Sequence, residues 1–250
     1  MEKYSFVFFS RPGIGKTTLL ATAAQDERTA PALMLDFEAH TLSIRSKIQL
    51  ISVEDLCAGK IPETDKYLVV RIREWEELES VLDYFEENES PIKSIGVDSI
   101  SEISYMNIRK ICRRGTGRKP GISEDEPPDI THWQTYTVQM LRLVRRFRDL
   151  PQHIFLSAQL DEYSDPGTGL SLFKAALSGQ EVPRQVGHLV DCIGYYFADR
   201  EGKRIMQFTP NNRIIAKDGT EGSLFKENID DPTITKLLDT IERSGQGILL

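Results

Sequence analysis

The segment 10–18, SRPGIGKTT, has the residue types of a phosphate-binding loop. Such a loop follows the pattern G-x-x-x-x-G-K-[ST], in which successive backbone N–H groups point at phosphate oxygens. Gly15, Lys16 and Thr17 stand in place, but Ser10 occupies the position of the first glycine. That position mainly closes the turn, which a small residue can also do at some cost in strain. We predict a nucleotide site here; the alternative is a chance G-K-T at the start of an ordinary helix.

The loop residues have distinct expected roles. Lys16 would reach the β- and γ-phosphates of ATP, and the Thr17 hydroxyl would hold Mg²⁺. An acidic side chain on another strand, Asp98, would position the same ion. The predicted nucleotide-binding residues are therefore Arg11, Pro12, Gly13, Ile14, Gly15, Lys16, Thr17, Thr18 and Asp98, with Thr17 and Asp98 at the metal.

Three polar side chains stand at the ends of other predicted strands. Glu38 follows LMLDF, Asp98 follows SIGV, and Gln159 follows IFLSA. Ligands of an open parallel sheet bind beyond the carboxyl ends of its strands, so these side chains should converge near Lys16. Glu38 could orient the attacking water as a general base, and the Gln159 amide could sense the γ-phosphate. The alternatives are turn-forming or helix-capping acids and a surface amide.

The order of elements predicts an α/β fold with a mainly parallel twisted sheet and helices on both faces. We expect strands over 4–9, 31–38, 67–72, 92–99 and 153–158, and helices over 17–25, 74–88, 101–114 and 132–150. The segments 115–129 and 160–180 are predicted to be mobile because they are rich in Gly, Pro and charge or lack apolar periodicity.

The C-terminal part of the chain has a different pattern. Residues 190–210 predict an antiparallel hairpin that turns at Glu201-Gly202, 212–217 another strand, and 233–244 an amphipathic helix. No linker clearly divides the 250 residues, so we expect one domain, with a core over about 4–189 and the hairpin and helix over about 190–245.

Composition excludes several classes of protein. The net charge of −7 argues against a protein that coats DNA along its whole surface, so nucleic acid would need a local basic patch. The apolar run FVFF is too short for a signal peptide or a membrane span. Cys57, Cys112 and Cys192 form no C-x-x-C pair, which is typical of a reducing compartment. We therefore expect a cytoplasmic protein without membrane contact.

Three of these segments carry a family resemblance. DFEAHTL (36–42) is similar to the acid-bearing segment of RecA-type recombinases, VDSIS (97–101) resembles their Walker-B strand, and FLSAQ (155–159) resembles the strand that ends in their allosteric glutamine. Within that superfamily the chain looks most like compact phage-encoded ATP-binding proteins, a group that includes Sak-type single-strand annealing proteins. The resemblance implies a RecA-like P-loop NTPase core over roughly 4–240, with ATP and Mg²⁺ as cofactors.

The resemblance also implies roles for particular residues. Lys16, Glu38 and Gln159 would act in ATP hydrolysis, and the mobile segments would contact single-stranded DNA. The segment IIAKDGTEG (214–222) is similar to the A-K-x-R-x-G strand end whose basic side chains reach a neighbouring protomer's ATP. Lys217 matches the lysine, Gly219 stands where the arginine belongs, and Arg213 is a weaker substitute. The implied assembly is a homo-oligomer, either a filament or a ring; the alternative for Lys217 is an exposed lysine near a turn.

A basic cluster lies where the first DNA-binding loop would be. It consists of Arg109, Lys110, Arg113, Arg114, Arg118 and Lys119, with no acid among them. These charges could neutralise several phosphates of single-stranded DNA. The alternative is a solvated helix end that favours the helix dipole. An acidic run follows (Glu124, Asp125, Glu126 and Asp129) and could fold back on the cluster.

The sequence therefore predicts a slow, DNA-stimulated ATPase that uses ATP to gate single-stranded DNA binding in phage-type recombination or annealing, with recombination proteins as further partners. Two other functions stay open. One is an ATP-dependent switch or loader that binds a protein, which the net negative charge favours. The other is a small-molecule P-loop kinase whose arginine-bearing lid would be 109–119.

Overall fold

The computed structural model of the chain describes residues 3–117, 119–123, 126–164 and 169–245. Its strands are β1 (Ser5–Ser10), β2 (Ala32–Asp36), β3 (Ile48–Leu50), β4 (Tyr67–Arg71), β5 (Ser94–Asp98), β6 (His153–Ser164), β7 (Ser171–Ala175), β8 (Cys192–Ala198), β9 (Arg204–Gln207) and β10 (Ile229–Asp230). Its helices are α1 (Lys16–Ala21), α2 (Val53–Cys57), α3 (Trp75–Glu87), α4 (Ile100–Arg114), α5 (Ile130–Asp149), α6 (Glu181–Leu189) and α7 (Ile234–Gly245), with 3-10 turns at Thr22–Gln25 and Leu42–Lys47.

The strands form one mainly parallel sheet in the order β10-β9-β8-β1-β6-β5-β2-β4-β3. The strands from β8 to β3 in this order run parallel, and β9 and β10 extend the sheet in antiparallel fashion. Both features match the predicted α/β class and its C-terminal antiparallel extension. The strand that carries the phosphate-loop motif, β1, lies between β8 and β6, in the interior of the sheet.

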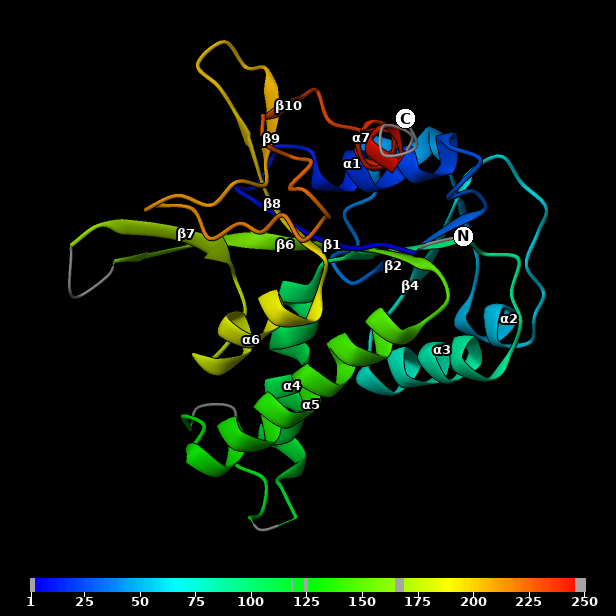
Figure 1. Cartoon of the computed structure of the whole chain (residues 1–250). Coiled ribbons are helices and arrows are strands. Elements are labelled where there is room, and N and C mark those ends of the chain that lie inside the picture. The colour runs from blue at the N-terminus through cyan, green and yellow to red at the C-terminus, as the bar shows by residue number, and fades with distance from the viewer. Residues whose placement is uncertain (1–2, 118, 124–125, 165–168, 246–250) are drawn as a thin grey trace.

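Successive side chains of a strand point to opposite faces of the sheet, so the strands contribute to two apolar layers, one on each face. On one face of β1, Val7 and Phe9 join a cluster with residues of α3, α4, α5 and α6. On the other face, Phe6 and Phe8 join a cluster with residues of α1 and α7. Figure 1 shows this division, with α1 and α7 above the sheet and α2 to α6 below it. The sheet is therefore covered on both faces, which explains why its strands read as continuous apolar runs.

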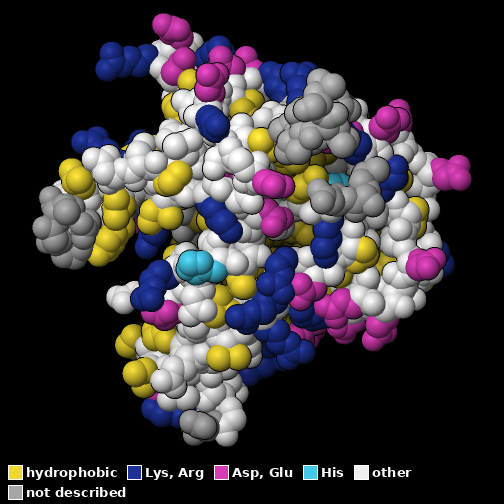
Figure 2. Space-filling view, viewed as in Figure 1, with side chains coloured by type: hydrophobic (Ala, Val, Ile, Leu, Met, Phe, Trp, Pro, Cys, Tyr) yellow, Lys and Arg dark blue, Asp and Glu magenta, His cyan; other side chains and the backbone are white. Residues whose placement is uncertain are grey.

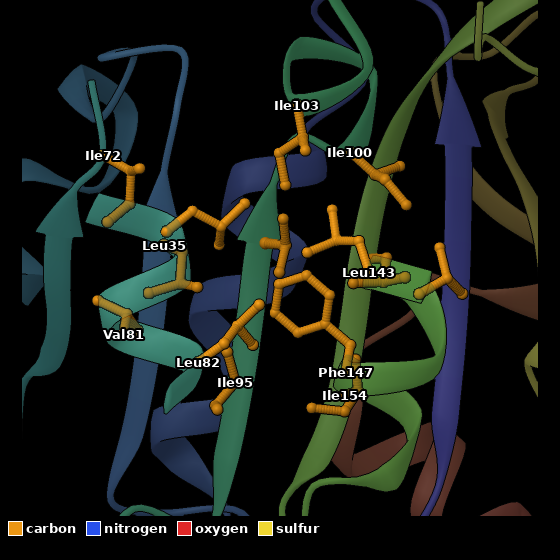
Figure 3. Packing of buried hydrophobic residues seen from close by; sticks show 14 of the residues in the cluster. Leu35, Ile72, Val81, Leu82, Ile95, Ile100, Ile103, Leu143, Phe147 and Ile154 are labelled. Atoms are coloured by element: carbon orange, nitrogen blue, oxygen red, sulfur yellow. The ribbon is translucent and has the colours of Figure 1, made fainter. Parts of the chain in front are cut away.

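The larger layer is a close-packed interface between helices and strands (Figure 3). Leu35 and Ile95 come from neighbouring strands and meet Val81 and Leu82 of α3, while Phe147 of α5 packs beside them. Ile100 and Ile103 of α4 lie at the upper end of the same layer. Because α4 begins directly after β5, this packing fixes the start of α4 at the carboxyl edge of the sheet.

The prediction of a mobile segment over 160–180 is wrong for the residues that the structure describes. β6 continues past the parallel sheet to Ser164 and pairs antiparallel with β7, with Leu160 opposite Ala175 and Ser164 opposite Ser171. The helix α6 follows. The polar residues in this hairpin masked its alternation, because no residue of its paired segments, 160–164 and 171–175, is fully buried and no continuous apolar stripe is needed.

One other local prediction needs correction. Residues 212–217 do not form a strand; they make only isolated bridges, Ile214 to Phe173 and Lys217 to Ile193. In 115–129, the described residues are tied to the end of α4, where the N–H of Ile122 donates to the carbonyl of Cys112 at 2.8 Å. The short elements β3 and α2 were not predicted. No helix within the described ranges is long and apolar enough to cross a bilayer.

The C-terminal segment contributes to the core of the main sheet. Phe208 and Phe225 stack on each other with ring centroids 4.3 Å apart, and each also meets Phe6 of β1 edge-on. All three rings are buried. β1 thus packs against residues more than 200 positions further along the chain, which supports a proposal that 1–250 folds as one domain.

We expect Phe225→Ala to lower the free energy of unfolding of the whole domain by about 3–5 kcal/mol, because it removes a buried ring and leaves a cavity. The measurement is chemical denaturation followed by both circular dichroism and tryptophan fluorescence. The neighbouring exposed residue offers a control, and Lys226→Ala should change stability by less than about 0.5 kcal/mol. Two separate transitions in the wild type would contradict the single domain.

Candidate nucleotide-binding site

The phosphate-loop motif sits at the carboxyl end of β1, in the strand–loop–helix setting that phosphate binding requires. β1 ends at the buried Ser10, and α1 begins at Lys16. Gly13 and Gly15 have φ values of 80° and 109°, a region that residues with a β-carbon rarely adopt. The two glycines therefore let the backbone curl so that its N–H groups face inward. Arg11, Pro12 and Gly13 are exposed at the mouth of the loop, and Ile14 and Thr18 are half-buried.

Serine at the first glycine position is accommodated by hydrogen bonds. The Ser10 hydroxyl donates to the carbonyl of Arg11 at 2.9 Å and lies 3.4 Å from the ammonium of Lys16, which donates to it. Burial lowers the pKa of Lys16, while the nearby charges of Asp98 and Glu38 oppose that shift. Ser10 thus faces the same small volume as the lysine, and it replaces the absent glycine without displacing the loop.

Asp98, the last residue of β5, joins the phosphate loop to β6. Its two carboxylate oxygens accept hydrogen bonds from the hydroxyls of Thr17 and Ser157, each at 2.5 Å. Burial raises the pKa of Asp98 despite these bonds and the charge of Lys16. A buried carboxylate beside a threonine hydroxyl fits Mg²⁺, which is typically held by one or two protein oxygens plus phosphates and water. The described residues include no cluster of three or more His, Cys, Asp or Glu that could hold a metal ion.

Glu38 follows β2 and is held in place from two sides. Its Oε1 accepts a hydrogen bond from the hydroxyl of Ser99 at 2.6 Å. Its backbone N–H and that of Ala39 donate to Oδ1 of Asp36, which stabilises the turn after the strand. The exposed His40 lies 3.7 Å from Oε2 of Glu38. The Glu38 side chain keeps 19% of its surface exposed, so water can reach it.

Gln159 lies in β6, directly beside Ser10 of β1 in the parallel register. Its amide nitrogen donates to Oε1 of Glu102 at 3.2 Å and lies 3.5 Å from Oε1 of Glu38. The Gln159 backbone N–H donates to the hydroxyl of Ser101. The amide therefore connects the carboxylate of Glu38 to the first turn of α4.

The sheet order explains why these side chains meet. β1, β6, β5 and β2 are consecutive neighbours. The loop follows β1, Asp98 ends β5 and Glu38 follows β2. Gln159 does not end its strand as expected, because β6 runs on to Ser164, but it lies at the level where β1 ends. The structure thus brings Lys16, Thr17, Glu38, Asp98 and Gln159 to one edge, as their positions at strand ends predict.

Lys217 is not brought to this edge. Its ammonium donates to the carbonyls of Gly187 at 3.0 Å and Val190 at 2.6 Å, which caps the end of α6. Asp191, next to Val190, bonds to Ser5 at the opposite end of β1 from the phosphate loop. The expected catalytic role of Lys217 therefore finds no geometry within the chain, and a role toward a neighbouring protomer would require both bonds to break.

The departure at Gly219 has a steric cause. A β-carbon on Gly219 would lie 2.2 Å from the carbonyl oxygen of Asp191, so no larger residue fits without moving the backbone. The arginine expected two residues after Lys217 is thus excluded. Arg213 is exposed, and its carbonyl accepts from the N–H of Phe173 in β7.

Sequence reasoning missed four side chains at this edge. Three of them are described above: Ser99 directly follows Asp98, Glu102 lies four residues after Asp98, and Ser157 lies two residues before Gln159. A serine or a helical glutamate alone carries no distinctive signal in a sequence. The fourth is Arg204 of β9, whose guanidinium packs against Gly15 of the phosphate loop. Its position depends on which strands are neighbours, which the linear pattern does not reveal.

The basic cluster divides into two groups in the structure. Arg109, Lys110, Arg113 and Arg114 line a cleft of about 690 Å³ between α3, α4 and the ends of β2 and β4. Lys119 is paired with Asp129 at the start of α5. Arg118, Glu124 and Asp125 lie outside the described residues.

Comparison with known proteins agrees with this geometry. A search of curated proteins found no match for the chain. The model of the protein family described as "AAA domain" matches residues 2–220, which include β1, the phosphate loop and every residue discussed at this edge of the sheet. The chain therefore belongs to this AAA-domain family, whose members have a P-loop ATPase-like fold and nucleotide-binding function.

Proposed function

We propose that this protein binds ATP with Mg²⁺, hydrolyses it slowly and uses the nucleotide to gate binding of single-stranded DNA in recombination or annealing of the phage type. The observation that carries the ATPase part is the meeting of Lys16, Glu38 and Gln159 at one edge of the sheet. Nucleotide binding by a P-loop ATPase rests on the family match. The DNA part rests on a cleft that shares a wall with this site.

Each residue of the site has a task in hydrolysis. Lys16 would leave the Ser10 hydroxyl for the β- and γ-phosphate oxygens, and Thr17 with Asp98 would hold Mg²⁺, which supplies positive charge to the phosphates. Glu38 would accept the proton of the attacking water, since its other oxygen is already fixed by Ser99. Gln159 would report the γ-phosphate to α4 through Glu102.

The cleft has the chemistry of a nucleic-acid contact. Six cationic side chains line it, Arg71, Arg73, Arg109, Lys110, Arg113 and Arg114. Trp75 and the 45%-exposed Tyr105 also line it and offer rings on which bases could stack. Asp36 and Glu102, which contact the Glu38 turn and Gln159, form its inner wall. A strand bound there would lie directly behind the catalytic carboxylate.

A second candidate function, an ATP-dependent switch that binds a protein, is favoured by ion pairs within the cleft. Glu76 pairs with Lys110 at 3.6 Å and with Arg114 at 2.6 Å, and Lys110 also lies over the ring of Trp75. These contacts reduce the charge offered to DNA. We propose the homo-oligomer on the resemblance alone, and whether it is a filament or a ring is left open.

We expect Glu38→Gln to keep ATP binding but slow hydrolysis by about two to four decades, the usual contribution of a general base. The glutamine oxygen can still accept from Ser99, so the side chain stays in place. The measurement is phosphate release at saturating ATP, beside ATP affinity. Lys16→Ala should instead abolish tight binding of ATP. Turnover of Glu38→Gln equal to that of the wild type would remove Glu38 from the mechanism.

We expect the protein with ATP and Mg²⁺ to bind labelled oligo-dT, with an affinity that falls steeply with salt. The plot of the logarithm of the binding constant against the logarithm of salt concentration has a negative slope. The double substitution Arg109→Ala with Arg113→Ala should make this slope shallower by about 1.4, since single strands release about 0.7 counterions per neutralised phosphate. DNA should also raise the wild-type ATPase rate.

The matched control removes two exposed arginines from α5, Arg142 and Arg145. Figure 2 shows Lys and Arg side chains gathered over α5 beside acidic side chains over α3, and Arg146 there pairs with Asp83 and Glu86. The control should leave DNA binding unchanged. No binding of DNA at low salt would favour the protein-binding switch.

A further inference from the structure

An arginine from the C-terminal hairpin lies directly on the phosphate loop. A β-carbon built on Gly15 would be 3.3 Å from Cζ of Arg204, 3.5 Å from Nη2 and 3.6 Å from Nε. Three atoms of the guanidinium therefore lie within 3.6 Å of the point where a β-carbon of this loop glycine would stand. Gly15 is the residue immediately before Lys16, so the two cationic groups flank the same turn of backbone.

The sheet register explains how Arg204 reaches the loop. β8 runs parallel beside β1, with Tyr195 opposite Phe9, and then continues for three residues to Ala198, past the end of β1. β9 returns antiparallel with Arg204 directly opposite Ala198. Arg204 is thus held by strand pairing at the level of the phosphate loop. Figure 1 shows this hairpin rising from the sheet on the side of α1.

Strand pairing also fixes the backbone of Arg204 on its outer side. Its carbonyl accepts a hydrogen bond from the N–H of Asp231, next to β10, at 2.7 Å. The side chain is exposed, and within the described residues no carboxylate forms an ion pair with it. Arg204 is thus a cation that is anchored by its backbone and exposed at its tip, next to the phosphate loop.

We propose that Arg204 binds the phosphate chain of the nucleotide that occupies the phosphate loop of its own chain. This inference rests on the proposed function, because it needs ATP in that loop. The guanidinium carries five donors in a planar fork that matches phosphate oxygens in a bidentate manner. With this contact, the β8–β9 hairpin becomes part of the nucleotide site, and Arg204 supplies from within the chain a cation that Lys217 does not.

The experiment measures dissociation constants by isothermal titration calorimetry, with Mg²⁺, for wild type, Arg204→Ala, Arg204→Lys and the control Arg200→Ala. Arg200 is an exposed arginine in the turn of the same hairpin. The ligands are ATP and inorganic tripolyphosphate, which lacks base and sugar. We expect Arg204→Ala to weaken both ligands by about tenfold or more, the scale of a hydrogen-bonded charged pair.

Arg204→Lys should recover part of the affinity because it keeps the charge but loses the bidentate fork. Arg200→Ala should bind both ligands as the wild type does. Thermal melting without ligand should give equal midpoints for all four proteins, since the arginine tip is exposed.

Three results would overturn the proposal. The first is wild-type affinity of Arg204→Ala for ATP. The second is weakened binding of ATP with unchanged binding of tripolyphosphate, which would place the guanidinium on the base or sugar. The third is an equal loss in Arg200→Ala, which would show a general effect of charge. No ATP binding by the wild type would overturn the proposed function as well, whereas the first three results leave it standing.

Discussion

The bonds of the Asp98 carboxylate are the interaction on which the site depends. One oxygen accepts from Thr17 at the start of α1, and the other accepts from Ser157 in β6. A single buried anion thus ties the phosphate loop to its neighbouring strands. Burial disfavours the charged form of Asp98 and raises its pKa, and the nearby ammonium of Lys16 offsets that effect only in part. We propose that Mg²⁺, bound together with phosphate, offsets the rest of this charge.

From this contact the other groups of the site follow in order. Ser99, next to Asp98 in the chain, fixes Glu38, and it also accepts the N–H of Glu102 as the N-terminal cap of α4. Glu102 in turn holds Gln159. Three strands and one helix therefore share a continuous set of hydrogen bonds, and each side chain that faces the expected γ-phosphate has a partner that fixes its direction. Such support is what positions catalytic groups closely enough to act.

Much of this edge could be predicted from the sequence because local patterns determine it. The buried runs of β1, β2, β5 and β6 are recognisable, and a polar residue at the end of each run must lie where parallel strands end. The positions of Arg204 and Lys217 depend instead on the order of strands. Arg204 lies beside Gly15, 189 residues earlier in the chain, and Lys217 donates to Gly187, 30 residues earlier. No pattern in the chain indicates that β8 passes the end of β1, or that a lysine caps α6. The β6–β7 hairpin escaped prediction because its partly buried faces require no continuous apolar stripe.

The helix α4 has a consequence for how signals could travel. Its 15 residues span about 22 Å, with Ser99 and Glu102 at the beginning and the basic side chains near the end. The helix is packed along its inner face by Ile100, Ile103, Ile108 and Ile111, so we expect it to shift as one unit rather than to bend. A tilt of its far end would therefore shift the hydrogen bond from Ser99 to Glu38 and the one from Gln159 to Glu102. We propose that α4 thereby couples the alignment of Glu38 and Gln159 to whatever binds near its far end.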